Sequence, residues 1–398
     1  MRNELVQLPS IAPIDLIRLP QDLDGHAGAN RAVGPAQISA GTDVEAVTAW
    51  LANFYGRSTF DSYRKEAERL LLWSVYEMGK PLSSLNHEDF LVYQRFLSEL
   101  EPGSRWVLDT GQKKVSRQDP AWRPFAGPLS PSSQRQAMII LNAMFSWLVD
   151  AGYLRGNPLS LIRQRRRKKP PRVTRFLEHD VWQEVKATIS AMPRETDRER
   201  AHYFRVRWLF TLLYIGGLRI SEVIGNTMGD FFHRRDKEGE IRWWLEVTGK
   251  GEKTRLVVAT EELMIELARY RRENGLPPSP ATGEDAPLLF RIGRDKSALR
   301  RPLTRGAVHV IVKKVFEDTA QRLRLMGPGY EEAVLAVERA SAHWLRHTSG
   351  THMLDNAVDL RRLRDNLGHE SIATTNNYAH AEDDERHKQI EEKHRLGW

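Results

Sequence analysis

One arginine draws notice because it lies in an otherwise apolar segment, LYIGGLRISEVI. This residue is Arg219, and Glu222 follows it at a distance of about one helical turn. Two interpretations fit the pair. It is either a buried structural ion pair, or an anion-binding guanidinium that the carboxylate holds in place.

A second group of polar side chains occurs over 343–347. His343, Arg346 and His347 would share one face of a helix, because residues three and four apart are neighbours there. Histidines with this spacing also occur as metal ligands. However, His352 would be turned off the face, and the sequence contains neither cysteine nor an HExxH motif. We therefore expect no metal site, while a solvated polar face stays open as an alternative.

Two further reactive side chains are associated with glycines. Lys250 stands between two glycines in the turn that joins two predicted strands. Gly368 is typical of a helix C-cap, so His369 is expected at a turn, and Tyr378 follows nine residues later. Taken alone, Tyr378 could equally be a packed aromatic side chain.

Together these residue types are those of a phosphoryl-transfer site that works without a metal. Two arginines can clamp the non-bridging oxygens of a phosphodiester with forked hydrogen bonds. A phenol can attack the phosphorus and form a covalent ester, and a lysine can protonate the leaving 5′ oxygen. Imidazoles can move protons in the same site.

Four segments carry these residues in an order that resembles the tyrosine recombinase (phage integrase) family. They are GLRISEV (217–223), GKGEKTR (249–255), HWLRHTSGTHML (343–354) and LGHESIATTNNYAHA (367–381). Two earlier segments, STFDSYRKE and SSQRQAMIILNAMFSWLVDAGYLRGNPL, are similar to the family's core-binding domain. The resemblance spans about 44–381. It implies a mainly α fold with a small antiparallel β-sheet, in which a helical, SAM-like core-binding domain precedes an α/β catalytic domain.

The resemblance implies a set of catalytic residues and one supporting carboxylate. They are Arg219 and Arg346 as the phosphate clamp, Lys250 as the general acid, His343 for proton handling, His369 at the family's His-or-Trp position, Tyr378 as the nucleophile and Glu222 as the support. Lys253 is the neighbouring rival of Lys250. We prefer Lys250 because it lies between glycines at the tip of the predicted hairpin.

The implied activity is that of a site-specific recombinase, of integrase or transposase type, that cuts and rejoins duplex DNA. The tyrosine would form a 3′-phosphotyrosyl link and release a 5′-hydroxyl, and a 5′-hydroxyl of a partner duplex would reverse the step. The ester conserves the bond energy, so no cofactor, ATP or metal is expected. The family implies a homotetramer on paired DNA sites that passes through a Holliday junction. Two alternatives stay open: a type IB topoisomerase, and a DNA-binding accessory protein that does not cleave.

These residues must be positioned by two domains and a linker. Helical periodicity predicts a helical domain over 44–160, and alternating helices and strands predict a mixed domain over 176–398. The resemblance implies that the first is the core-DNA-binding domain and the second the catalytic domain. The helices expected in the second domain are 176–191, 199–218, 261–272, 304–325, 341–354, 360–367 and 372–378. The expected strands are 241–247 and 254–259, with a short one at 287–292.

The predicted linker, 161–175, is strongly basic. No acidic residue interrupts its eight Lys and Arg residues, which are Arg163, Arg165, Arg166, Arg167, Lys168, Lys169, Arg172 and Arg175. The Pro170-Pro171 pair cannot continue a helix, so an extended linker is expected. Like charges in such a run repel one another unless an anion neutralises them. We therefore expect contact with the DNA backbone, against the alternative of a merely solvated run.

Other segments have less defined predictions. Residues 1–43 contain four prolines and no Phe, Tyr or Trp, and predict a flexible arm; the alternative is an arm that orders against DNA or a partner subunit. The stretches 101–127 and 321–340 lengthen the family pattern without touching a motif. The tail after Tyr378 has an acidic run and then a charged helix. The family resemblance implies that this helix docks on a neighbouring subunit, against the alternative of a frayed helix.

The composition agrees with a DNA-binding role. The 398 residues carry 60 Lys and Arg against 52 Asp and Glu, which gives a net charge of +8 and favours a nucleic-acid partner. The absence of cysteine excludes disulfides, Cys-bound zinc and cysteine nucleophiles. No apolar stretch is long enough to span a bilayer and no signal pattern is present, so a cytoplasmic location is expected.

Overall fold

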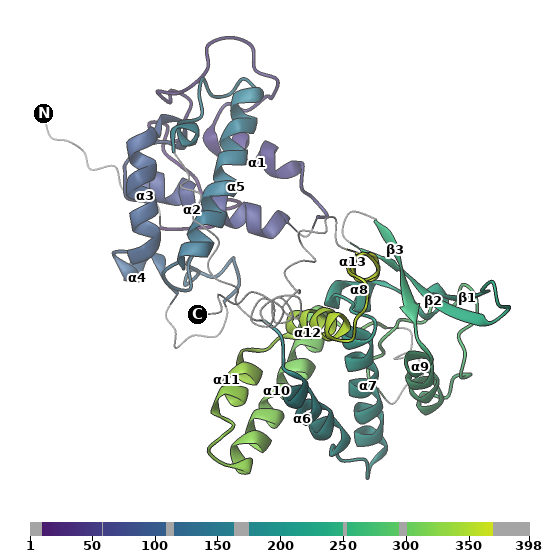
Figure 1. Ribbon diagram of the computed structural model, residues 1–398. Coiled ribbons are helices and arrows are strands. Elements are labelled where there is room, and N and C mark those ends of the chain that lie inside the picture. Colours follow the sequence, from purple (N-terminus) through teal and green to yellow (C-terminus); the bar gives the residue numbers. More distant parts are fainter. Residues whose placement is uncertain are drawn as a thin grey trace, which may run out of the picture. The chain divides into compact units, whose positions relative to one another are not determined.

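The structure is a computed structural model, which describes residues 10–57, 59–108, 115–162, 175–249, 253–293 and 301–368. The chain divides into two compact units, Met1–Arg167 and Lys168–Trp398 (Figure 1). Each unit has a hydrophobic core of its own. The point of division falls within the sequence of the predicted linker.

The first unit is helical. Its α-helices are α1 (Asp43–Ala52), α2 (Phe60–Tyr76), α3 (His87–Glu99), α4 (Gly103–Trp106) and α5 (Pro131–Asp150). Polar side chains explain where several of them begin: Thr42 and Asn86 each complete a capping box, and Ser130 caps α5, which has a proline in its first turn. Aromatic pairs stiffen the core, such as the edge-to-face contact of Phe90 and Phe145, whose centroids are 5.3 Å apart.

The described part of the predicted flexible arm is packed, not free. Ile14 and Ile17 are buried in the core of the first unit, and the backbone N–H of Ile14 donates to Oε1 of Glu68 on α2 at 2.8 Å. The prediction of a flexible arm over 1–43 is therefore wrong from residue 10 onward. Few of its apolar residues are buried, and they do not extend into a periodic pattern of helix length, so the sequence does not reveal their burial.

The second unit combines helices with a three-stranded sheet. Its helices are α6 (His179–Ser190), α7 (Asp197–Tyr214), α8 (Ile220–Gly225), α9 (Glu261–Glu273), α10 (Arg305–Met326), α11 (Glu331–Arg339), α12 (Ala342–Asp355) and α13 (Leu360–Leu367). The strands β1 (Phe231–Arg235), β2 (Ile241–Thr248) and β3 (Thr254–Ala259) form an antiparallel sheet in that order. The expected fold class, mainly α with a small antiparallel sheet, is confirmed.

Most of the elements predicted in this unit are confirmed. The sequence analysis did not predict α8, β1 or α11 as separate elements. The strand expected at 287–292 is wrong, because Pro287 and Phe290 make only isolated bridges, to Thr227 and Pro302 respectively. The helix expected at 372–378 lies outside the described residues.

The core of the second unit is centred on α7. Trp208 of this helix is buried, and its Nε1 donates to the carbonyl oxygen of Leu288 at 2.7 Å. The stretch 321–340 extends α10 and adds α11, which lies beside α10 (Figure 1) and buries Val334 and Val337. Helix α12, which follows α11 in the chain, carries the histidine and arginine residues of interest.

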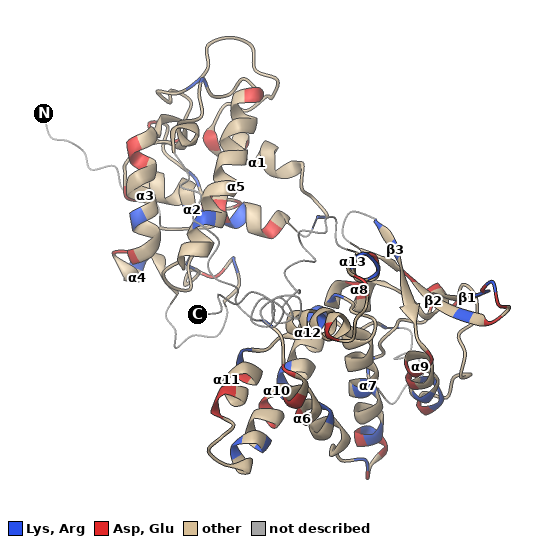
Figure 2. Ribbon diagram, in the orientation of Figure 1, with Lys and Arg blue, Asp and Glu red and all other residues tan. Residues whose placement is uncertain are grey.

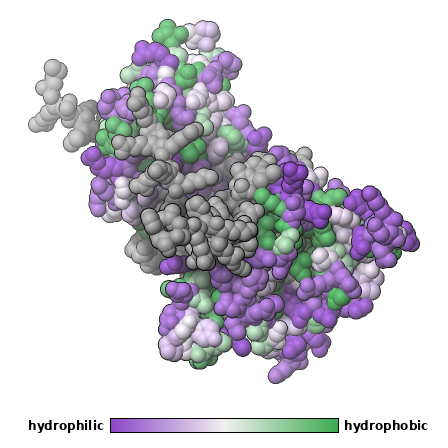
Figure 3. All heavy atoms as spheres, viewed as in Figure 1, coloured by the Kyte–Doolittle hydropathy of each residue, from purple (hydrophilic) through white to green (hydrophobic). Residues whose placement is uncertain are grey.

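Charge and hydropathy vary over the surface of the described residues. Basic and acidic residues are both present on the helices of each unit, whereas α13 is largely basic, with three arginines among its eight residues (Figure 2). Hydrophobic residues appear as separate patches among hydrophilic ones on the face drawn in Figure 3. None of the helices in the described ranges is long and apolar enough to cross a membrane.

Candidate active site

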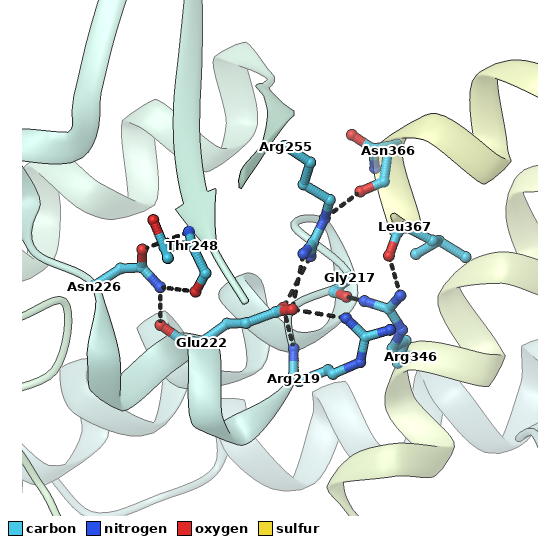
Figure 4. Close-up of polar contacts among 9 residues, drawn as sticks. All are labelled: Gly217, Arg219, Glu222, Asn226, Thr248, Arg255, Arg346, Asn366 and Leu367. Atoms are coloured by element: carbon cyan, nitrogen blue, oxygen red, sulfur yellow. Dashed lines mark hydrogen bonds and ion pairs between the residues drawn. The ribbon is translucent and has the colours of Figure 1, made fainter. Parts of the chain in front are cut away.

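The turn between α7 and α8 places Arg219. Gly217 has a φ of +57° there, which a residue without Cβ adopts readily, and a Cβ would meet Cδ2 of Leu367 at 2.6 Å. Arg219 is the N-cap residue of α8. Its backbone N–H donates to Oε2 of Glu222 at 2.8 Å, and its Nη1 donates to Oε1 at 2.7 Å (Figure 4). The carboxylate thus holds both the backbone and the guanidinium of the arginine.

Glu222 also binds a second arginine, which the sequence did not single out. Nη1 and Nη2 of Arg255, on β3, donate to Oε1 and Oε2 of Glu222 at 2.7 and 2.8 Å. Burial alone would raise the pKa of Glu222, but the hydrogen bonds and charges of Arg255 and Arg219 outweigh this effect and lower the pKa to about 2. Glu222 is therefore ionised at any working pH. Arg219 is held in an ion pair with Glu222, but its side chain is 41% exposed, so the pair is not fully buried on the arginine side.

Arg346, on α12, meets the same turn from the opposite side (Figure 4). Its side chain is buried, with Nη1 donating to the carbonyl oxygen of Gly217 and Nη2 to that of Leu367. The first contact ties α12 to the turn before Arg219, and the second ties it to the last turn of α13. The two arginines predicted to form a clamp are thus brought to one place from distant parts of the sequence.

The histidines of α12 lie on the predicted face. The rings of His343 and His347 meet edge to face, with centroids 4.5 Å apart. Desolvation and the positive charges of Arg346 and Arg219 lower the pKa of His343. Desolvation and the charges of His343 and Arg346 lower the pKa of His347 to about 4. At neutral pH both rings are therefore mainly uncharged, and an uncharged imidazole can accept a proton.

His352 is turned off this face, as the five-residue gap predicts. Its Nε2 is 3.0 Å from the carbonyl oxygen of Leu177, to which it must donate, so its Nδ1 accepts from the hydroxyl of Tyr214 at 2.9 Å. This arrangement fits a neutral ring, and burial lowers the pKa of His352 to about 4. His352 therefore anchors the start of the second unit. Within the described ranges, no group of three or more His, Cys, Asp or Glu side chains could hold a metal ion.

Several predicted site residues lie outside the described residues. They are Lys250, His369, Tyr378, Arg163, Arg165, Arg166, Arg167, Lys168, Lys169 and Arg172. The structure describes Gly249 and Lys253, on either side of the segment that contains Lys250, and Gly368, which precedes His369. The N–H of Gly249 donates to the carbonyl of Lys253 at 2.9 Å at the base of the hairpin. Gly368 ends α13 with a φ of +63°, so the prediction of a glycine C-cap is confirmed.

Two residues that position the site were missed in the sequence, Arg255 and Asn226. Asn226 is buried at the end of α8; its Nδ2 donates to the carbonyl of Glu222 at 2.8 Å, and its Oδ1 accepts from the N–H of Thr248 at 2.9 Å. It joins the helix of Glu222 to the strand that leads into the hairpin. A signal for Arg255 was present, since it shares the inward face of β3 with the buried Val257 at the two-residue period of a strand.

Comparison with known proteins agrees with this geometry. Residues 176–385 match the Phage integrase family. Tyrosine recombinase XerD of Brucella abortus is 28% identical over 291 residues, which cover 72% of this chain and 83% of that protein. XerD of Xanthomonas axonopodis pv. citri is 28% identical over 336 residues, or 83% of this chain and 88% of that protein. The fold resembles that of the XerH site-specific recombinase bound to a palindromic difH substrate in a post-cleavage complex, with a TM-score of 0.55 and 18% identity, over 84% of this chain and 80% of that chain.

Proposed function

Since the chain belongs to the phage integrase family and is a site-specific tyrosine recombinase, we propose that Tyr378 is its nucleophile and that Arg219 and Arg346 clamp the scissile phosphate. The observation that carries this proposal is the meeting of the two arginines at the turn around Gly217. A pair of guanidiniums fixed at one turn is suited to bind the two non-bridging oxygens of a phosphodiester.

The proposed cleavage step balances with groups of this chain. The phenol oxygen of Tyr378 attacks the phosphorus and forms the 3′-phosphotyrosyl ester, while the bond to the 5′ oxygen breaks. The phenolic proton passes to a neutral imidazole, for which His343 is suited by its lowered pKa. Lys250 gives a proton to the leaving 5′ oxygen, and His369 donates a hydrogen bond to the phosphate. The reverse attack by the 5′-hydroxyl of a second duplex rejoins the strands.

Covalent trapping tests this function and identifies the DNA site in the same experiment. The protein is incubated with a pool of duplexes that carry a randomised segment and a nick just beyond it, so that the short 5′-hydroxyl fragment dissociates after cleavage. We expect a denaturant-resistant adduct on a 3′ end without added metal, and sequencing of the attached DNA should return one site. Binding without an adduct would point to an accessory protein. Adducts without sequence preference, with relaxation of any plasmid, would point to a topoisomerase.

We propose that the first unit holds the core-DNA-binding domain, over 44–160, and that the basic linker contacts the DNA backbone. Replacing Arg165, Arg166 and Arg167 together by alanine should flatten the plot of log K against log salt by about one unit for each phosphate that is no longer neutralised. Titrations at several salt concentrations measure the slope. An unchanged slope would mean that the linker charges are solvated in the complex.

We also propose that the protein works as a homotetramer on two DNA sites, linked by exchange of its C-terminal segment. After the acidic run Glu382–Glu385, the few apolar residues Ile390, Leu396 and Trp398 provide too little apolar surface to fold alone. Deleting 383–398 should leave binding to a single site unchanged, but should weaken the pairing of two sites and reduce recombination. A gel shift decides this: the same yield of paired complex at the same protein concentration would exclude the tail as the link.

A further inference from the structure

Arg255 is held at the site more firmly than a simple surface arginine would be. Its side chain is 11% exposed. Two of its nitrogens donate to the two carboxylate oxygens of Glu222 at 2.7 and 2.8 Å, and its Nε donates to the carbonyl oxygen of Asn366 at 3.0 Å (Figure 4). One guanidinium thus joins β3 to α8 and to the last turn of α13.

The cluster of Arg219, Glu222 and Arg255 carries a net positive charge. Glu222 carries one negative charge and lies between two guanidiniums, which carry two positive charges. Arg255 occupies both oxygens with its fork and is nearly enclosed, whereas Arg219 uses one nitrogen and is 41% exposed. The surplus positive charge therefore falls on the arginine that solvent, and hence a substrate, can reach.

The elements that neighbour Arg255 fix its position in the fold. It follows Thr254, whose pairing with Thr248 closes the sheet just before the segment that contains Lys250. A Cβ on Gly368 would meet Cδ of Arg255 at 2.5 Å, so the glycine leaves room for this arginine. Arg255 is thus fixed by both of its neighbouring elements, and its fork cannot move without disturbing them.

We propose that Arg255 is a positioning residue for strand cleavage: by neutralising Glu222 it leaves the charge of Arg219 available to the scissile phosphate. This inference rests on the proposed function. Arg255 does not touch the substrate in this account. It acts through Glu222, and its removal should therefore mimic a weakened Arg219.

The first test compares two DNA substrates in single-turnover cleavage, using the site recovered by covalent trapping. On the normal phosphodiester, Arg255→Met should slow cleavage by on the order of tenfold or more, less than the loss expected for a direct contact. On a methylphosphonate at the scissile position, the negative charge that Arg219 must meet is absent. On this substrate the cleavage rate of Arg255→Met should be within about threefold of the rate of the unaltered protein. An equal loss on both substrates would overturn the proposal, because a general structural defect does not depend on phosphate charge.

A double-variant cycle asks whether Arg255 acts through Arg219. Adding Arg255→Met to Arg219→Met should slow cleavage by less than about threefold beyond Arg219→Met alone, because the group through which it acts is already missing. Multiplication of the two single losses would show that Arg255 works independently of Arg219 and would contradict the proposal.

The pH profile provides a separate measurement. The Arg255→Met variant loses the main group that holds the pKa of Glu222 low, so this pKa should rise. Protonation of Glu222 then removes the negative charge that Arg255 no longer neutralises. The loss of cleavage in Arg255→Met, measured relative to the unaltered protein at the same pH, should therefore be largest at neutral pH and shrink as the pH falls through the raised pKa, while the unaltered protein keeps Glu222 ionised. Arg255→Lys retains a positive charge without the fork, so its loss should be smaller at neutral pH and should depend less on pH. Identical profiles for all three proteins would count against a role through Glu222.

A matched control separates loss of position from loss of folding. Arg207 forks onto Glu266 with Nε and Nη2 at 3.0 and 2.5 Å, and it joins α7 to α9, which carry none of the proposed catalytic residues. Arg207→Met should change the thermal unfolding midpoint at least as much as Arg255→Met, yet leave cleavage unchanged. Failure of the unaltered protein to form any adduct would refute the proposed function. Normal cleavage by both the unaltered protein and Arg255→Met would refute only this inference.

Discussion

Replacing Tyr378 by phenylalanine is expected to abolish the covalent protein–DNA adduct, a loss on the order of 10⁴-fold or more in single-turnover cleavage. The change removes one oxygen, which is the atom proposed to attack phosphorus. The ring remains, and so do the clamp arginines and the basic linker. DNA affinity should therefore stay within about twofold, because phosphate contacts supply most of the binding free energy. Denaturing gels measure the adduct, and gel shifts on the same duplex measure the binding.

Another tyrosine of the second unit provides the control. Tyr330, the N-cap residue of α11, is 36% exposed and is not one of the proposed site residues, so Tyr330→Phe should leave adduct formation unchanged. Buried tyrosines of both units are poor nucleophiles, since burial raises the pKa of Tyr93 and Tyr270 above the usual range. An adduct that persists in Tyr378→Phe would place the nucleophile elsewhere, and peptide mapping of that adduct would locate it.

The parts of the site that were predictable from sequence are those set by local rules. Helix α13 has the predicted bounds, because leucines at a helical spacing bury one face and Gly368 adopts the left-handed conformation that ends it. The β2–β3 hairpin was predictable because residues of alternating burial flank a glycine-rich turn. Neighbouring residues determine both features.

The parts that were not predictable depend on contacts between distant residues. Arg255 and Glu222 are 33 residues apart, and only the packing of β3 against α8 brings them together. The segment 10–42 packs onto the first unit through scattered residues such as Ile14, whose partner Glu68 is 54 residues away. The strand β1 was missed because only Phe231 is buried among its five residues, which leaves no clear alternation.

The two clamp arginines differ in ways that the sequence could not show and that mutation should separate. Arg346 is 1% exposed, and its guanidinium spans two backbone carbonyls, whereas Arg219 is 41% exposed and shares its carboxylate with Arg255. Arg346 therefore supports the fold, in addition to its proposed contact with the scissile phosphate. Arg219 is held in place by the carboxylate of Glu222, which remains paired with Arg255 when Arg219 is replaced.

Arg346→Lys and Arg219→Lys should accordingly have the same effect on cleavage and different effects on stability. Each keeps a positive charge but loses the bidentate fork, so each should slow single-turnover cleavage by on the order of 10²-fold or more, with little change in DNA affinity. In Arg346→Lys, one amine cannot reach both the Gly217 and Leu367 carbonyls, so a buried acceptor is left unpaired at about 1–3 kcal/mol. Arg219→Lys leaves Glu222 paired with Arg255 and should change the free energy of unfolding by less than about 1 kcal/mol.

Denaturant unfolding and single-turnover assays on both variants provide the comparison. Cleavage at the unaltered rate in either variant would mean that the arginine concerned is only an ion-pair or hydrogen-bonding partner within the fold. Equal destabilisation of the two variants would contradict the division of roles, since Arg219 would then support the fold as strongly as Arg346. The effect on stability thus depends on which acceptors within the fold each arginine holds, whereas the effect on cleavage depends on its proposed contact with the phosphate.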